Sequence, residues 1–449
     1  MLGWLHRRGG VAVALLLAVS GCTAREHRQP APVTDVTEVR AVDPGRVPGI
    51  MPVTRVDERR RAFAAYPSVA GARPLDDALA RAVDEWFRLH EERRGVHELN
   101  VEWSLTAFSD RVIGVRLVAE HGDTGGGGAE HGGTEHGGTG RGGAGEREGT
   151  ERRTFWYDRD AGAVRAPGDL VDEARLAELV RQEAQTGRAG HAAPGGFPSL
   201  AFNDQGDLVA EFGSEAVAIG YRAYEPLLTP FGHRARDAAL TVRPVPRRDA
   251  VPRTLVAPVD CRTAKCVALT FDDGPGPETG RLLDILAGHG ARATFFVVGG
   301  NAAALPATLR RQRAAGHVIG NHTHAHRDLT RLPALRVSSE IQRTQRAIKA
   351  ATGEGATLLR APYGAVNGTV TAVARSLGLA HVGWNAAPEG GGDIAAEAVA
   401  GARPGGVVRL RDVDRESVDA VPEILARLAA DGYTFVTVPE LRAAGTVPR

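Results

Sequence analysis

The first candidate for chemistry is a pair of adjacent carboxylates, Asp272 and Asp273, in the segment Thr270-Phe-Asp-Asp-Gly-Pro275. The pair directly follows a short apolar run. Two neighbouring carboxylates are costly to hold together unless a cation neutralises them. The segment therefore predicts a cation site, unless it is only a helix cap or a turn.

The second candidate is the histidine-rich segment Asn321-His-Thr-His-Ala-His326. If this segment opens a helix, His322 and His326 lie four residues apart on one face, and His324 points elsewhere. Two histidines and one carboxylate are a recurrent ligand set of catalytic zinc, which keeps one position for water. Taken alone, the segment is equally compatible with a solvated loop.

Alternating strands and helices surround both polar segments. Apolar runs predict strands at 267–271, 293–298 and 434–438, and helical spacing predicts helices at 277–289 and 302–315. Repeated βα units indicate an α/β domain with a parallel sheet, either open or closed into a barrel. In a barrel the reactive residues lie at the carboxyl ends of the strands, which is where both polar segments fall. Their joint placement favours a reactive site over two unrelated polar loops.

The first half of the chain has a different pattern. Residues 23–70, with scattered proline and charge, predict a tether, and 246–262 predict a linker. Between them, residues 71–245 predict a smaller α+β domain. Its expected helices are 75–87 and 169–181, and its expected strands are 101–108, 112–118, 152–157, 208–212 and one near Val217.

A glycine-rich stretch, residues 121–150, interrupts this domain with fourteen glycines and a tandem Glu-His-Gly-Gly-Thr repeat. Such a stretch cannot bury enough apolar surface to offset the entropy of ordering it. It predicts a long loop inside a hairpin. Its histidines, His121, His131 and His136, fit a solvated spacer better than a metal site.

The N-terminus has the pattern of an export signal. Arg7 and Arg8 precede the apolar run Val11–Val19, which is too short to span a bilayer and suits a secretory signal. The signal ends in Val19-Ser-Gly-Cys22, which resembles a bacterial lipobox. We expect residues 1–22 to be a lipoprotein signal, with Cys22 lipidated and the protein anchored outside the membrane. A plain signal peptide with an incidental cysteine is the alternative.

Two further cysteines, Cys261 and Cys266, stand close together before the first strand of the α/β domain. In an exported protein such a pair predicts a small disulfide loop, since no further soft metal ligands are nearby. A net charge of +1 with 5% aromatic residues gives no sign of a nucleic-acid partner.

The two polar segments resemble the first two motifs of polysaccharide deacetylases related to the nodulation-factor chitooligosaccharide deacetylase. The segments 290–299 and 315–321 also look like this family, and Arg360-Ala-Pro-Tyr-Gly364 looks like its third motif. The resemblance implies a deformed (β/α) barrel over 263–445.

The resemblance also implies roles for individual residues. The residues that it assigns to Zn or another divalent metal are Asp273, His322 and His326. It makes Asp272 the general base, oriented by an ion pair with Arg360, and it gives the backbone N–H of Tyr363 to the oxyanion. The implied reaction is hydrolysis of an acetyl group, on nitrogen or on oxygen, in a cell-wall polysaccharide such as peptidoglycan or a chitin-like polymer.

Two positions depart from the family pattern. The fourth motif usually carries two aspartates and a tryptophan, which here fall near Ala387, Gly390 and Gly391. The fifth motif usually ends in a histidine that serves as general acid, and Arg411 stands in its place. Arginine cannot release a proton at physiological pH. Either Asp272 passes its proton to the leaving group, or Arg411 stabilises negative charge as an ester is cleaved.

The sequence therefore predicts a cell-surface, zinc-dependent polysaccharide deacetylase. The alternative is a catalytically impaired, metal-bearing lipoprotein that binds or senses peptidoglycan. A metal-dependent hydrolase for another acyl substrate is a third interpretation. Residues 75–240, with signatures such as Thr154-Phe-Trp-Tyr-Asp158, are similar to the extracellular domain of lysozyme-sensing anti-sigma factors, which precedes the catalytic domain in some peptidoglycan deacetylases.

Overall fold

The computed structural model describes residues 37–92, 97–123, 149–185, 196–212, 215–241, 259–388 and 392–445. Cys22, His131, His136 and most of the predicted linker lie outside these ranges. None of the helices within them is long and apolar enough to cross a membrane. We call residues 37–241 the N-terminal region and residues 259–445 the C-terminal region.

A parallel sheet forms the centre of the C-terminal region, with the strand order β14-β13-β12-β11-β10-β15 and with β16 also paired to β10. A bridge between Ala386 and Val408 brings the chain beyond β14 against β15, so the sheet curls back on itself. This confirms the predicted α/β fold with a deformed barrel. The strands are β10 (Cys266–Asp272), β11 (Thr294–Val297), β12 (Val318–Asn321), β13 (Leu358–Leu359), β14 (Ala380–His381), β15 (Gly406–Arg411) and β16 (Thr434–Phe435).

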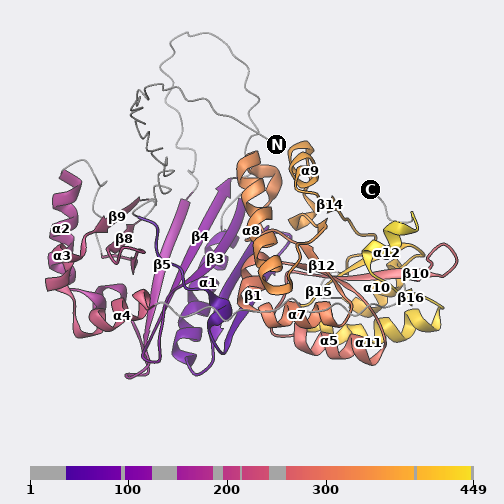
Figure 1. Ribbon diagram of the computed structural model, residues 1–449, viewed down its shortest axis with the longest axis horizontal. Coiled ribbons are helices and arrows are strands. Elements are labelled where there is room, and N and C mark those ends of the chain that lie inside the picture. Colours follow the sequence, from indigo (N-terminus) through magenta and orange to yellow (C-terminus); the bar gives the residue numbers. More distant parts are fainter. Residues whose placement is uncertain are drawn as a thin grey trace, which may run out of the picture. The chain divides into compact units, whose positions relative to one another are not determined.

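Helices cover the sheet, and Figure 1 shows α5, α7 and α11 grouped along one side of it. Apolar side chains such as Phe271, Leu282 and Val408 form a continuous core between strands and helices, which provides the main stabilisation of the region. The helices are α5 (Thr279–Gly288), α6 (Gly299–Ala304), α7 (Pro306–Ala314), α8 (Ala334–Thr352), α9 (Gly368–Ser376), α10 (Ile394–Gly401), α11 (Arg415–Ala430) and α12 (Val438–Ala443).

Two local predictions in this region are wrong. The helix expected at 302–315 is broken into α6 and α7, because Pro306 lacks an N–H and takes the favoured first position of a new helix. The helix at 321–326, on which the argument from the spacing of His322 and His326 was conditional, does not form either. After Asn321, the last residue of β12, the chain continues as a loop in which Thr323 and His326 have φ angles of 64° and 59°.

The N-terminal region is built on a six-stranded sheet with the order β1-β2-β3-β4-β5-β6. Its strands are β1 (Ile50–Asp57), β2 (Ala62–Val69), β3 (His97–Phe108), β4 (Val112–Asp123), β5 (Gly149–Asp158) and β6 (Ala163–Arg165). Helix α1 (Arg73–Glu92) packs on this sheet through buried side chains that include Leu75, Leu79 and Trp86. The arrangement confirms the predicted α+β class.

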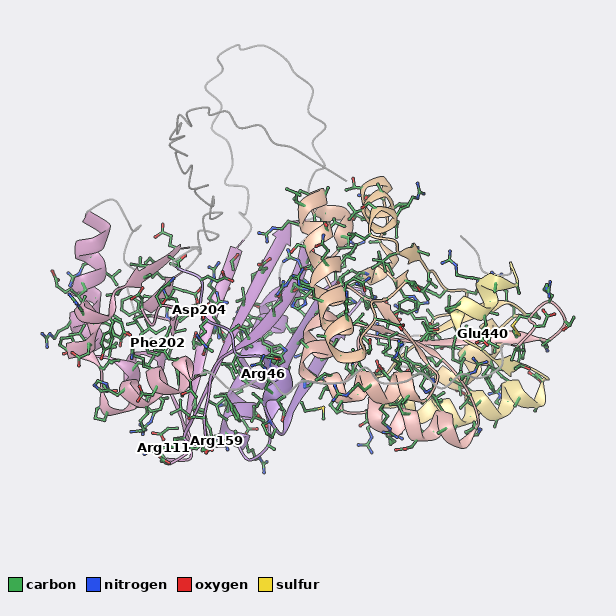
Figure 2. All side chains as sticks on the ribbon, in the orientation of Figure 1. Arg46, Arg111, Arg159, Phe202, Asp204 and Glu440 are labelled. Atoms are coloured by element: carbon green, nitrogen blue, oxygen red, sulfur yellow. A yellow bond between two sulfur atoms is a disulfide. The ribbon has the colours of Figure 1, made fainter. Side chains whose placement is uncertain are left out.

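A second, three-stranded sheet completes the N-terminal region. It contains β7 (Ser199–Phe202), β8 (Leu208–Phe212) and β9 (Glu215–Ile219). The helices beside it are α2 (Glu173–Gln185), α3 (Tyr221–Tyr224) and α4 (Pro230–Leu240). Figure 2 shows Arg111 and Arg159 together in adjacent turns of the larger sheet, where the backbone N–H of Arg159 donates to the carbonyl of Arg111 at 2.8 Å.

The predicted tether over 23–70 is wrong for residues 50–69, which form β1 and β2. Three of the eight residues of β2 are alanines, and its first four residues are all buried, so the sequence shows no apolar alternation there. The prediction of a solvated His121 is also wrong, because this residue lies at the end of β4 and only 5% of it is exposed. The glycine-rich loop does connect two antiparallel neighbours, β4 and β5, as expected.

Cys261 and Cys266 form a disulfide at the entry to β10. Glu440, labelled on α12 in Figure 2, lies near the same entry and accepts a hydrogen bond from the backbone N–H of Val259. Its carboxylate also accepts from Thr437 and pairs with Arg292 at 2.6 Å. The first and last segments of the C-terminal region are thus held together beside β10.

Candidate metal centre

The carboxylate pair lies at the carboxyl end of the central strand. Every residue of β10 is buried, and Asp272 is its last residue. The chain then turns sharply, with a φ of 73° at Asp273. Gly274 must follow, because a Cβ at this position would lie 2.1 Å from the carboxylate of Asp412. The strand and the turn together hold both carboxylates at one edge of the sheet.

Asp273, His322 and His326 come together at this edge. Their ligand atoms all lie within 4.8 Å of one another, and at most 3% of each residue is exposed. Nε2 of His322 lies 3.4 Å from Oδ1 of Asp273, and Nε2 of His326 lies 3.2 Å from the same oxygen. Both oxygens of Asp273 are buried without a hydrogen-bond partner. The three side chains therefore fit a divalent metal, since two imidazoles and one carboxylate are its usual protein ligands at an open site.

The ring of His322 has a defined tautomer. Its Nδ1 lies 2.7 Å from the backbone carbonyl of Arg360, and because a carbonyl oxygen can only accept, Nδ1 must carry the hydrogen. Nε2 then keeps its lone pair and faces Asp273. Orientation of a ligand histidine through its second nitrogen is a common feature of metal sites.

The electrostatic field at the centre favours a cation. Burial alone would raise the pKa of Asp273, but His326, His322 and Arg411 outweigh it and hold the pKa well below its usual range. Burial also opposes protonation of His322, yet the carboxylates of Asp273 and Asp272 raise the pKa of this ring. Burial lowers the pKa of His326 despite the same carboxylate. A buried, ionised carboxylate that faces two imidazoles suits a metal ligand.

Asp272 forms a separate ion pair beside the three candidate ligands. Its Oδ1 accepts a 2.7 Å hydrogen bond from Nη1 of Arg360, which also donates to Oγ1 of Thr270. Arg360 follows β13, is fully buried and donates further to the carbonyls of Val382 and Gly383. Its guanidinium therefore has a fixed position, and the second oxygen of Asp272 remains without a partner.

Tyr363 and Trp384, from the next loops, lie against His326 and Arg360 respectively. The ring of Tyr363 meets the ring of His326 edge to face, with the centroids 4.8 Å apart, and the tyrosine has a φ of 58°. The ring of Trp384 lies beside the guanidinium of Arg360. Of the positions expected for the fourth motif, Ala387 follows Trp384 closely, whereas Gly390 and Gly391 lie outside the described residues.

Arg411, the last residue of β15, points into the centre. Its Nε lies 3.1 Å from Oδ2 of Asp273, as an ion pair without hydrogen-bond geometry. Burial lowers the pKa of Arg411, but Asp273 and Glu58 outweigh this effect and raise it. The side chain is therefore a permanent cation beside a candidate metal ligand.

Four residues near the centre were not found from the sequence. Asp412 lies next to Arg411, and burial raises the pKa of its carboxyl to about 7, although Thr279 donates a hydrogen bond to it. The sequence signal that could have identified Asp412 is its position directly after an apolar strand. Arg409, Glu58 and Phe63 are the others, and the last two fall in the predicted tether.

A curled parallel sheet with a buried aspartate and two buried histidines at the carboxyl ends of its strands defines an α/β protein with a candidate metal centre. A family profile described as polysaccharide deacetylase matches residues 260–382. A chitooligosaccharide deacetylase from Rhizobium leguminosarum bv. trifolii is 42% identical over 194 residues, which cover 39% of this chain and 90% of that protein. The chain therefore belongs to the polysaccharide deacetylase family.

Two further relatives act on peptidoglycan according to their names. Peptidoglycan-N-acetylglucosamine deacetylase PgdA from Listeria monocytogenes (strain 10403S) is 36% identical over 186 residues, which cover 40% of this chain. The chain spans only 39% of the length of that enzyme. The solved structure of peptidoglycan deacetylase PdaC from Bacillus subtilis is 35% identical in sequence, with a TM-score of 0.40. The match covers 42% of this chain and 94% of the PdaC chain. The similarity of residues 75–240 to anti-sigma factors stays a prediction.

Proposed function

We propose that the protein is a zinc-dependent deacetylase of cell-wall polysaccharide, with peptidoglycan or a chitin-like N-acetylglucosamine polymer as substrate. One observation carries the proposal. The buried group Asp273, His322 and His326 lies directly beside the ion pair of Asp272 and Arg360. Candidate ligands and a candidate base therefore share one edge of the sheet, as hydrolysis of an acetyl group requires.

Each residue of the centre has a separate role in the proposed hydrolysis. When bound, a divalent metal supplies Lewis-acid polarisation of a carbonyl and lowers the pKa of water. Asp272 takes a proton on its free Oδ2, while Arg360 fixes its Oδ1 at 2.7 Å. We assign the backbone N–H of Tyr363 to the oxyanion, as the family resemblance implies. Expulsion of the sugar amine then needs a proton, which Asp272 returns.

The cation at Arg411 distinguishes this centre from one with a separate acid. Asp273 and Glu58 raise the pKa of Arg411 beyond its already high value, so the side chain gives up no proton at neutral pH. An amine must be protonated to leave, whereas an alkoxide leaves more readily. Arg411 therefore favours esters over amides as substrates.

The same observation supports a second candidate function. With Arg411 in place of a separate acid, the described part of the centre suits a metal-bearing protein that binds peptidoglycan without turnover. The unused oxygen of Asp272, fixed by Arg360, favours the enzyme, because a binding protein needs metal ligands but no oriented base.

The test is acetate release from peptidoglycan and from chitooligosaccharides by the purified full-length chain. The chain is first treated with a chelator and then given one equivalent of zinc. The proposal expects no release after chelation and recovery of release with zinc. Zinc binding without any acetate release from either polymer would favour the glycan-binding protein.

We also propose that the protein is held at the outer face of the cell membrane by a lipid on Cys22. The apolar run before Val19-Ser-Gly-Cys22 supports this location. Intact-mass analysis of membrane-extracted protein should show a diacylglyceryl group on a chain that begins at Cys22. A secreted product without this mass would refute the anchor.

A further inference from the structure

The turn between β1 and β2 reaches the candidate metal centre from the N-terminal region. The carboxylate of Glu58 in this turn binds two arginines of β15. Nη2 of Arg409 lies 2.9 Å from Oε2, and Nη2 of Arg411 lies 2.5 Å from Oε1. Burial opposes ionisation of Glu58, but the hydrogen bond from Arg409 and the charge of Arg411 outweigh it and lower its pKa. Glu58 is thus a carboxylate at neutral pH, with 25% of its side chain exposed.

Arg411 connects Glu58 to Asp273. Its Nε lies 3.1 Å from Oδ2 of Asp273, whereas Oδ1 of the same carboxylate faces the two imidazoles. The two oxygens of Asp273 are therefore divided between different neighbours. The arginine occupies one side and leaves Oδ1 directed toward the position between the histidines.

Groups that contact a metal ligand without touching the metal fix the direction of that ligand. Loss of such a partner typically lowers metal affinity by about 10- to 100-fold. Arg411 contacts the candidate ligand Asp273 in this way, and Glu58 in turn holds Arg411. The series of contacts starts in the N-terminal region and ends on a candidate ligand.

Two more contacts join the same hairpin to the centre. Phe63 of β2, only 1% exposed, stacks on the ring of His326 with the centroids 4.4 Å apart and an angle of 15°. Nδ2 of Asn301 donates both to Oγ1 of Thr54 in β1 and to the backbone carbonyl of Asp273. The hairpin thus contacts the surroundings of two of the three candidate ligands.

The charge of Glu58 has a direct electrostatic consequence. Arg409 and Arg411 are two residues apart on β15, so their side chains extend from the same face and repel each other. Glu58 offsets both charges. Without its charge, Arg411 turns more fully to Asp273 and competes with a metal for that carboxylate, and the local field becomes less favourable to a cation.

We infer that Glu58 is a positioning residue of the metal centre, which acts through Arg411 on the ligand Asp273 and makes the N-terminal region part of the centre. The inference rests on the proposed function only in that the centre binds a metal. It assigns Arg411 a role in metal binding rather than proton transfer.

The test is a double-mutant cycle on the zinc dissociation constant of the full-length chain, measured by competition with a chromophoric chelator. The variants are Glu58→Gln, Arg411→Gln and the double variant. Glu85→Gln is the matched control, because Glu85 pairs with Arg153 at 2.6 Å inside the N-terminal region, away from the centre. Circular dichroism and thermal unfolding show that each variant is folded, and Arg411→Met replaces Arg411→Gln if the latter is not.

Glu58→Gln should raise the zinc dissociation constant by about 10-fold, which is the lower end of the range for loss of a group that holds a metal ligand. Glu85→Gln should leave this constant unchanged. In the Arg411→Gln background the same change at Glu58 should have less than about a two-fold effect, because the contact through which it acts is gone. An unchanged constant in Glu58→Gln, or an equal loss in both backgrounds, would overturn the inference and leave the proposed function standing. A wild-type chain that binds no zinc would overturn both.

Discussion

The guanidinium of Arg360 donates a 2.7 Å hydrogen bond to the carboxylate of Asp272, and at most 2% of either side chain is exposed. Removing two charges from water costs free energy, and loss of one partner leaves the other charge buried and unpaired. A contribution to stability alone therefore does not account for this ion pair. Further hydrogen bonds from Arg360 to Thr270 and to backbone carbonyls fix the geometry of the pair. The direction of Asp272 is therefore set before any substrate binds.

The first prediction concerns Arg360→Lys. Lysine keeps the charge but cannot donate from several nitrogens in one plane, so it will not hold Asp272 while also satisfying the carbonyl of Gly383. We expect kcat to fall on the order of 10²-fold, since general-base catalysis contributes about 10²–10⁴ in rate. Steady-state acetate release measures this, with zinc content unchanged.

The control for this change is Arg281→Lys on α5, where the exposed arginine pairs with Glu278 and Asp419. Its kcat should match that of the wild type. Equal activity of Arg360→Lys and wild type would show that the buried pair does not orient a base.

The second prediction concerns the histidines of the loop after β12. His322→Ala and His326→Ala should lose bound metal, because each removes one of three candidate ligands. His324→Ala should retain it, since that ring lies outside the group. Metal content after dialysis against zinc measures all three. Equal losses in the three variants would contradict the ligand assignment.

The sequence predicted the α/β class, the placement of reactive residues at strand ends, and the proximity of Asp273, His322 and His326. Apolar runs and polar residue types indicated the first two, whereas the resemblance to polysaccharide deacetylases implied the third. The reason given for the histidine pair was wrong, because the two rings meet through a loop with positive φ angles rather than through a helix. Such angles depend on tertiary contacts, including the stacking of Phe63 on His326, which no local pattern encodes.

The contacts of the N-terminal region with the candidate metal centre also could not be predicted from the sequence. Residues 50–69 carry no strong strand signal. Glu58 gains its role only in the folded protein, where β15 brings Arg409 and Arg411 to its carboxylate. Pairings between residues more than 300 positions apart follow from the folded arrangement. Arg411 was singled out in the sequence, but its contact with Asp273 depends on how the fold brings the two strand ends together.

The third prediction concerns leaving groups. Because Arg411 donates no proton, the enzyme should hydrolyse O-acetyl groups relatively better than N-acetyl groups on matched sugars. Arg411→His, combined with Gly390→Asp, should raise N-acetyl hydrolysis relative to the ester if the motif positions are assigned correctly. Initial rates on both substrate types measure the ratio. A wild-type preference for the amide would refute the role given to Arg411.

The fourth prediction concerns pH and stability. Burial, together with the charge of Arg292, lowers the pKa of His317 to about 4, from about 6.5 in an unfolded chain. Well above pH 6.5 the ring is neutral in both states and has no effect. As pH falls from 6.5 toward 4, the unfolded state binds a proton that the folded state refuses, so stability declines.

Between pH 7 and pH 5 this histidine should remove about 2 kcal/mol from the free energy of unfolding. His317→Gln keeps an acceptor for the N–H of Ala293, which now bonds to Nδ1 of the ring, and removes the titration. Urea unfolding at both pH values measures the difference. A variant as sensitive to pH as the wild type would exclude His317 as the cause.

The central claim is that Asp272 is the base of a working deacetylase. The most direct test compares acetate release from N-acetylated peptidoglycan by wild type and by Asp272→Asn, both in saturating zinc and with equal metal content. The account predicts release by the wild type and a loss of about 10²–10⁴-fold in Asp272→Asn. A wild type no faster than Asp272→Asn, on both N-acetyl and O-acetyl substrates, would contradict the claim and leave a glycan-binding protein in its place.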